Sequence, residues 1–119
     1  MKTYTYYLTE LRWVTEEEGF GSSPQRARLI CTPAEFEEQT SLWSVCVFLD
    51  RPVYPGDVIT LPVTTLVSEM APVLLRPGCT FRLKPNGSTT WATGRVLSVE
   101  EVDEDENRRR RRFGPLDES

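Results

Sequence analysis

Histidine is absent from this chain of 119 residues. Since histidine is the usual general base near neutral pH and a common metal ligand, we expect neither Ser-His nor Cys-His catalysis within the chain. Cysteine is scarce: Cys31, Cys46 and Cys79 are widely spaced and include no C-x-x-C pair, which argues against a disulfide framework and a zinc site. We interpret all three as buried, unreactive thiols. We therefore expect a protein that is not an enzyme and holds no metal or cofactor.

Long apolar runs are also absent, and lysines are few. No run approaches the roughly 18 apolar residues that a membrane-spanning helix needs, and the segment MKTYTYYLTELRW lacks the apolar core of a signal peptide. We expect a cytoplasmic location without membrane contact. The two lysines, Lys2 and Lys84, lie outside any G-x-x-x-x-G-K-[ST] loop, so we expect no nucleotide binding.

Charge is distributed unevenly along the chain. Residues 1–99 carry nine Lys/Arg and ten Asp/Glu, and so nearly neutral a body is not typical of a general nucleic-acid-binding protein. Residues 100–119 contain almost nothing apolar, so we expect a β-barrel domain over 1–99 and a disordered tail over 100–119, acidic and then arginine-rich. The tail is either a solvated segment whose two halves neutralise each other or a tether to nucleic acid or an acidic partner. The tether would use Arg108, Arg109, Arg110, Arg111 and Arg112.

The apolar residues mostly alternate with a period of two, which predicts strands rather than helices. The expected strands cover residues 3–14, 26–31, 42–49, 59–67, 79–84 and 92–96. The turn signals between them include Pro55-Gly56, Pro77-Gly78 and Asn86-Gly87. This pattern predicts an all-β protein, a small six-stranded antiparallel barrel.

Two segments leave open questions. Pro33 has no backbone N–H, so we expect it to end the second strand and to begin a loop with one turn over residues 33–39. The segment 42–49 is apolar on both faces, with Val45 and Val47 expected to face the core. Cys46 and Phe48 on its other face need a second cover, which makes that face either a packing site within the chain or a partner site.

Three motifs together resemble the C-terminal barrel, domain III, of the translation factor elongation factor Tu. They are the acidic loop T-E-E-E-G at 15–19 with Pro24, the turn V-Y-P-G-D at 53–57, and the closing segment F-R-L-K-x-N-G with Thr89, Gly94 and Val96. The resemblance covers most of residues 1–99. It implies a barrel of the elongation factor Tu C-terminal domain type, which in that family is a docking surface rather than a catalytic part.

The chain departs from that family where the family holds tRNA. The usual Arg-His pair of the first loop is replaced by Gly21-Ser22, and the hairpin arginine is replaced by Ser88, which leaves only Lys84 with a positive charge. Because phosphate contacts need Lys or Arg, tRNA binding does not carry over well. The resemblance places candidate partner contacts at Glu17, Glu18, Gly21, Ser22, Lys84 and Ser88.

The expected function is a non-catalytic protein-interaction module that binds a translation-factor partner or a toxin targeting that factor. The alternative is an RNA-binding, specifically tRNA-binding, accessory protein in translation that contacts RNA through the arginine tail. The two alternatives differ in their response to salt, because phosphate contacts weaken steeply as the salt concentration rises.

Overall fold

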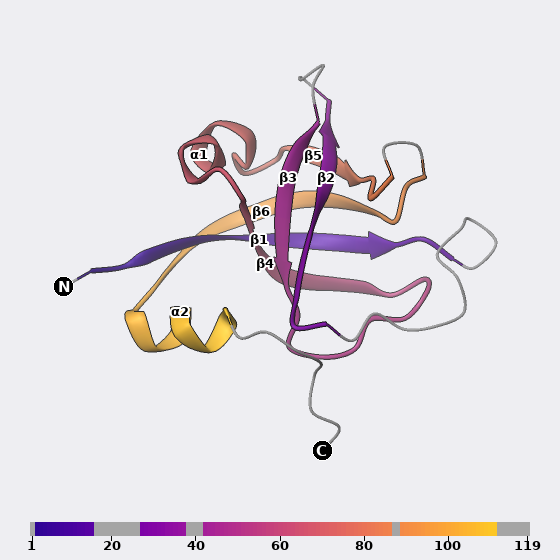
Figure 1. Cartoon of the computed structure of the whole chain (residues 1–119). Coiled ribbons are helices and arrows are strands. Elements are labelled where there is room, and N and C mark those ends of the chain that lie inside the picture. Colours follow the sequence, from indigo (N-terminus) through magenta and orange to yellow (C-terminus); the bar gives the residue numbers. More distant parts are fainter. Residues whose placement is uncertain (1, 16–26, 38–41, 87–88, 112–119) are drawn as a thin grey trace.

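The computed structural model describes residues 2–15, 27–37, 42–86 and 89–111, and within them it shows a mostly β protein. The strands are β1 (Tyr4–Trp13), β2 (Leu29–Phe36), β3 (Trp43–Phe48), β4 (Val58–Thr65), β5 (Thr80–Leu83) and β6 (Ala92–Val102). The short helices are the 3₁₀ turn η1 (Ser68–Met70), α1 (Ala71–Leu74) and α2 (Glu104–Arg110). The six strands close into an antiparallel barrel in the order β1-β4-β3-β2-β5-β6 (Figure 1). The predicted six-stranded antiparallel barrel is therefore confirmed.

The core lies inside the barrel because alternate residues of each strand point inward. Trp13, Leu61 and Phe81 are among the largest side chains with almost no exposed surface. At one end of the barrel α1 closes the interior with Leu74 and Leu75, which are buried in the same cluster. Full burial of one such leucine stabilises the fold by roughly 1.5–3 kcal/mol.

Glycine positions confirm the two predicted Pro-Gly turns. Gly56 and Gly78 have φ of 85° and 94°, and both predicted Pro-Gly turns close with an N–H to C=O bond, from Asp57 to Tyr54 and from Cys79 to Arg76. In β6, a Cβ on Gly94 would lie 2.6 Å from the ring of Phe81, its direct partner on β5.

The predicted end of the second strand at Pro33 is wrong, because β2 continues through it to Phe36. The C=O of Pro33 accepts the N–H of Lys84 at 2.8 Å. In an antiparallel strand the N–H and the C=O of one residue point to the same side. The nitrogen of Pro33, which carries no hydrogen, therefore faces Lys84, just beyond the last residue of β5. The proline therefore removes no bond from the ladder between β2 and β3.

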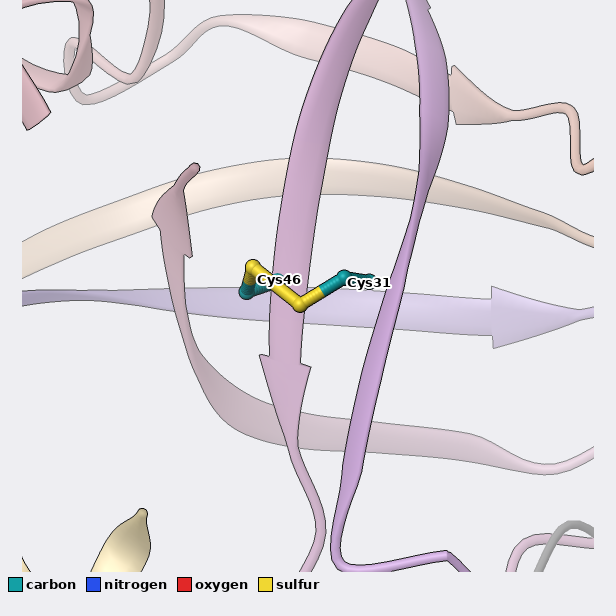
Figure 2. Close-up of a disulfide and its surroundings, with 2 residues drawn as sticks. All are labelled: Cys31 and Cys46. Atoms are coloured by element: carbon teal, nitrogen blue, oxygen red, sulfur yellow. A yellow bond between two sulfur atoms is a disulfide. The ribbon is translucent and has the colours of Figure 1, made fainter. Parts of the chain in front are cut away.

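The interpretation of three thiols is wrong for two of the cysteines. Cys31 and Cys46 form a disulfide between β2 and β3 (Figure 2), and their Cα atoms are 4.1 Å apart. The strand register places the two residues directly opposite each other, with Cys31 exposed and Cys46 buried. Sequence spacing carries no information on this register, which explains the error. Cys79 is a free, half-buried thiol.

The structure describes the first part of the segment that follows residue 99. β6 continues to Val102 because the ladder with β1 extends as far as the pair Tyr4 and Val102. After Asp103 the chain turns and α2 lies against the outside of the barrel (Figure 1). Residues 100–111 are thus part of the described structure, whereas Arg112 and the rest of the predicted tail lie outside the described residues.

Candidate interaction surfaces

The two loops predicted to contact a partner start at the barrel end opposite α1. The first follows β1 and the last precedes β6, and the N–H of Val14 donates to the C=O of Trp91 at 2.9 Å, so their flanks are adjacent. Most of the predicted contact residues lie outside the described residues: Glu17, Glu18, Gly21, Ser22 and Ser88. Their role stays a prediction.

Lys84 is the remaining residue of that set, and its charge is shared with the barrel. Its Nζ lies 3.2 Å from the carboxylate of Glu35, which is also 3.2 Å from the guanidinium of Arg82. The Lys84 side chain is only 15% exposed. These contacts join β2 to β5, so Lys84 does not present a free cation to a phosphate.

A different surface stands out at the barrel end that carries α1. The structure describes eight exposed large hydrophobic side chains, and six of them lie on α1 or on segments beside it or beside the end of β4 that precedes it. We call these six the apolar rim: Leu42, Leu66, Val67, Val73, Leu97 and Val99. The other two, Tyr54 and Val58, belong to the turn at the opposite end.

Backbone contacts bring the segments of the apolar rim together. The N–H of Leu66 donates to the C=O of Ser44 at 3.0 Å, which places the end of β4 beside the start of β3. The N–H of Gly78 donates to Val96 at 2.7 Å, which places the turn after α1 beside β6. The register between β1 and β6 skips Leu97, and such a bulge re-aims a side chain that would otherwise follow the alternation.

A cavity of about 420 Å³ adjoins the rim, between α1 and the ends of β2 and β5. Its apolar lining is made by Phe36, Val73, Leu74, Pro77 and Cys79. Glu37, Arg76 and Thr80 also line it, so the cavity has a mixed polar and apolar wall. Val73 belongs to both the apolar rim and the lining of the cavity, so the two features adjoin at α1.

The outer wall formed by β1, β4 and β3 also carries apolar side chains, but here they are covered. Tyr6, Cys46 and Phe48 form a second buried cluster, separate from the main core. The rings of Tyr6 and Phe48 meet edge to face with centroids 5.1 Å apart. This is the face of segment 42–49 for which a second cover was expected, and the structure supplies a packing site within the chain.

The cover is α2, which has no buried residue of its own. The hydroxyl of Tyr6 donates to the side-chain oxygen of Asn107, and the guanidinium of Arg110 lies 4.8 Å from the centre of the Tyr6 ring. Arg111 lies 5.4 Å from the centre of the Phe48 ring. The contact is therefore made by guanidinium groups over aromatic faces rather than by aliphatic side chains.

Carboxylates hold the arginines of α2 in place. Arg110 lies 2.7 Å from Glu100 of β6 and 2.7 Å from Glu106 of its own helix. The hydrogen bond from Arg109 is the main cause that lowers the pKa of Glu106 to about 2, with Arg110 adding to it against the effect of burial. Burial acts to lower the pKa of Arg110, but hydrogen bonds and charges of Glu100 and Glu106 raise it overall.

These ion pairs bear on the predicted nucleic-acid contacts. Arg108, Arg109 and Arg110 each pair with a carboxylate of the chain, and Arg111 donates to Asn107. Any RNA contact must therefore compete with these partners, and RNA binding by these arginines stays a prediction. Arg112 lies outside the described residues.

The docking of α2 was missed in the sequence, although a signal for the helix exists. Asp103 caps it by accepting the N–H of Glu106 at 2.9 Å, which corresponds to a D-x-x-E pattern. Acids fill the first turn and arginines the last turn, as the helix dipole favours. The partners Tyr6 and Asn107 are 101 positions apart, so no local pattern reveals their contact.

Comparison with known proteins adds no family to this geometry. A scan against protein-family models finds no match for the chain, and a search of the curated proteins also finds none. Within the described residues, no three or more His, Cys, Asp or Glu side chains are grouped as metal ligands would be. In the same part of the chain, each helix is too short or too polar to cross a membrane.

Proposed function

We propose that this protein is a non-catalytic protein-interaction module, built on a barrel of the elongation factor Tu C-terminal domain type. The apolar rim is the observation that carries the proposal. Exposed large hydrophobic residues scattered singly are ordinary, whereas a group of them beside a cavity is typical of a protein contact. Here six such side chains lie on the segments around α1, and one of them, Val73, lines the cavity.

The partner class comes from the resemblance in sequence. A barrel that resembles domain III of elongation factor Tu, but lacks the basic residues of the first loop and the last hairpin, retains the scaffold of a docking domain without its tRNA contacts. We infer that the partner is a protein that recognises this scaffold, either another translation factor or a toxin directed at it. The cytoplasmic location is part of this proposal.

Paired substitutions at the two ends of the barrel test the proposal. Val73→Glu with Leu97→Glu places two charges in the apolar rim, and Tyr54→Glu with Val58→Glu places two at exposed apolar positions of the opposite end. Tagged wild-type protein and both variants are incubated with nuclease-treated lysate, and the captured proteins are identified and quantified. We expect a translation factor or toxin to be captured by the wild type and the Tyr54/Val58 variant, and to be lost with the Val73/Leu97 variant.

Other outcomes contradict the proposal. Equal capture by both variants places the contact elsewhere, and capture of no specific protein by the folded wild type removes the interaction function. If untreated lysate yields RNA, and this RNA dissociates steeply with salt, the alternative of a tRNA-binding accessory protein is favoured instead.

A further inference from the structure

The wall beneath α2 has the composition of a site for arginine side chains. The guanidinium of Arg110 lies 4.8 Å from the ring centre of Tyr6 and 2.7 Å from the carboxylate of Glu100. Both recognising groups belong to the barrel rather than to the helix. An aromatic face and a carboxylate are the two groups that bind a guanidinium most strongly, and the Arg110 side chain is only 14% exposed.

A second guanidinium occupies the neighbouring part of the wall. Arg111 lies 5.4 Å from the ring centre of Phe48 and 5.9 Å from that of Tyr6. Because the two rings pack edge to face, the same platform accepts two successive arginines. We call Tyr6, Phe48 and Glu100 the arginine platform.

The helix that fills this platform is a weak occupant. It has seven residues, none of them buried, whereas isolated helices shorter than about 12–15 residues are marginal in water. Its remaining ion pairs, such as Arg108 with Glu104, are exposed and contribute little. None of the residues of the main core lies in α2, so the barrel interior does not depend on it.

We propose that the arginine platform is a docking site for an arginine-rich helical segment of a partner protein, and that α2 occupies it until such a segment displaces it. The chemistry of the occupant follows from the charge and ring contacts that α2 itself makes. The arginine platform and the apolar rim share no residue. An experiment on the platform therefore tests this docking site independently of the proposed interaction at the α1 end.

The test uses full-length protein and a synthetic peptide of residues 103–111. The double substitution Arg110→Ala with Arg111→Ala weakens the binding of the protein's own α2 and leaves the residues of the arginine platform unchanged. A short linker holds α2 at an effective concentration on the order of millimolar, so the peptide should compete poorly with it in the wild type. We expect the peptide to shift the ring resonances of Tyr6 and Phe48 in the variant, with an apparent affinity at least about tenfold higher than for the wild type.

A matched peptide with lysine at positions 110 and 111 supplies the control. Lysine keeps the charge but lacks the planar group that stacks on rings, so we expect binding weaker by about tenfold. Tyr6→Leu added to the double variant keeps an apolar side chain at this position, and we expect it to abolish the response to the arginine peptide.

Three results overturn the proposal. The first is a folded double variant whose ring resonances do not respond to about 1 mM arginine peptide, the concentration at which the cis helix acts. The second is equal affinity for the lysine peptide, which would show that the site attracts positive charge without recognising the guanidinium group. The third is a wild-type dimer that exchanges α2 between copies and is not dissociated by the peptide, which makes a second copy the occupant.

Discussion

Of the two apolar surfaces on the outside of this barrel, one is exposed to solvent and the other is covered by a helix. At the α1 end, the apolar rim is uncovered, and Leu66 and Val73 are 65% and 52% exposed. On the wall of β1, β4 and β3, Tyr6 and Phe48 are 0% and 3% exposed because α2 lies over them. The segment after β6, although almost free of apolar residues, thus covers an apolar surface through its arginines. An apolar cover is not required where the surface is aromatic.

The largest expected difference between the surfaces comes from truncating one apolar side chain on each. Tyr6→Ala removes a fully buried ring and the hydroxyl that holds Asn107, so we expect the free energy of unfolding to fall by about 3 kcal/mol. Val73→Ala removes an exposed side chain and should change it by less than about 0.5 kcal/mol. Urea unfolding of both variants measures this, and equal losses would contradict the assignment of a covered and an uncovered surface.

A smaller loss of stability is expected when single arginines of α2 are replaced by alanine. Arg110→Ala removes the contact with the Tyr6 ring and leaves Glu100 without this partner, so we expect a loss of about 1–2 kcal/mol. Arg108→Ala removes only exposed ion pairs within the helix and should cost less than about 0.5 kcal/mol. Thermal unfolding by circular dichroism compares the pair. A larger loss from Arg108→Ala would show that α2 is not seated on the wall by Arg110.

We expect acid to weaken the contact of α2 with the Tyr6 ring and to leave the apolar rim unchanged. The pKa of Glu106 is lowered from 4.5 to about 2 when α2 is folded, so the contribution of this carboxylate is fully present above pH 4.5 and is lost as the pH falls toward 2. We expect the ring resonances of Tyr6 to move toward exposed values across this window.

The control for the acid titration is Glu106→Gln, whose neutral amide cannot titrate. We expect this variant to lose most of the pH dependence between pH 4.5 and 2. Tyr6 resonances that are constant in the wild type over the same window would show that the Glu106 contacts do not hold α2.

The smallest effect on stability is expected at the apolar rim. Val73→Glu and Leu97→Glu place charges where the side chains already contact water, so the free energy of unfolding should change by less than about 0.5 kcal/mol. A loss of several kcal/mol for either single variant, measured in urea, would show that the rim is covered in solution, for instance by a second copy.

The strand pattern of the sequence was sufficient for the barrel. Alternation and the turns at Pro55-Gly56 and Pro77-Gly78 are local signals, and both turns form with glycine at positive φ.

The remaining features depend on register and on distant contacts. Pro33 is tolerated because its missing donor faces the end of β5, and Cys31 meets Cys46 because the β2–β3 register sets them opposite each other. The apolar rim was not predicted either, because its members come from four separate segments. For the cover over Phe48, the sequence showed that one was needed but not that the charged tail supplies it.

Photo-crosslinking from Val73 and Val58 tests directly whether the uncovered apolar rim is the protein-contact surface. A photoreactive side chain is placed at Val73 in one protein and at Val58 in another, both of which are exposed. We expect position 73 to crosslink to one specific protein, a translation factor or a toxin directed at one, and position 58 to give no such adduct. The same yield from both positions, or no specific adduct from position 73, would contradict this expectation.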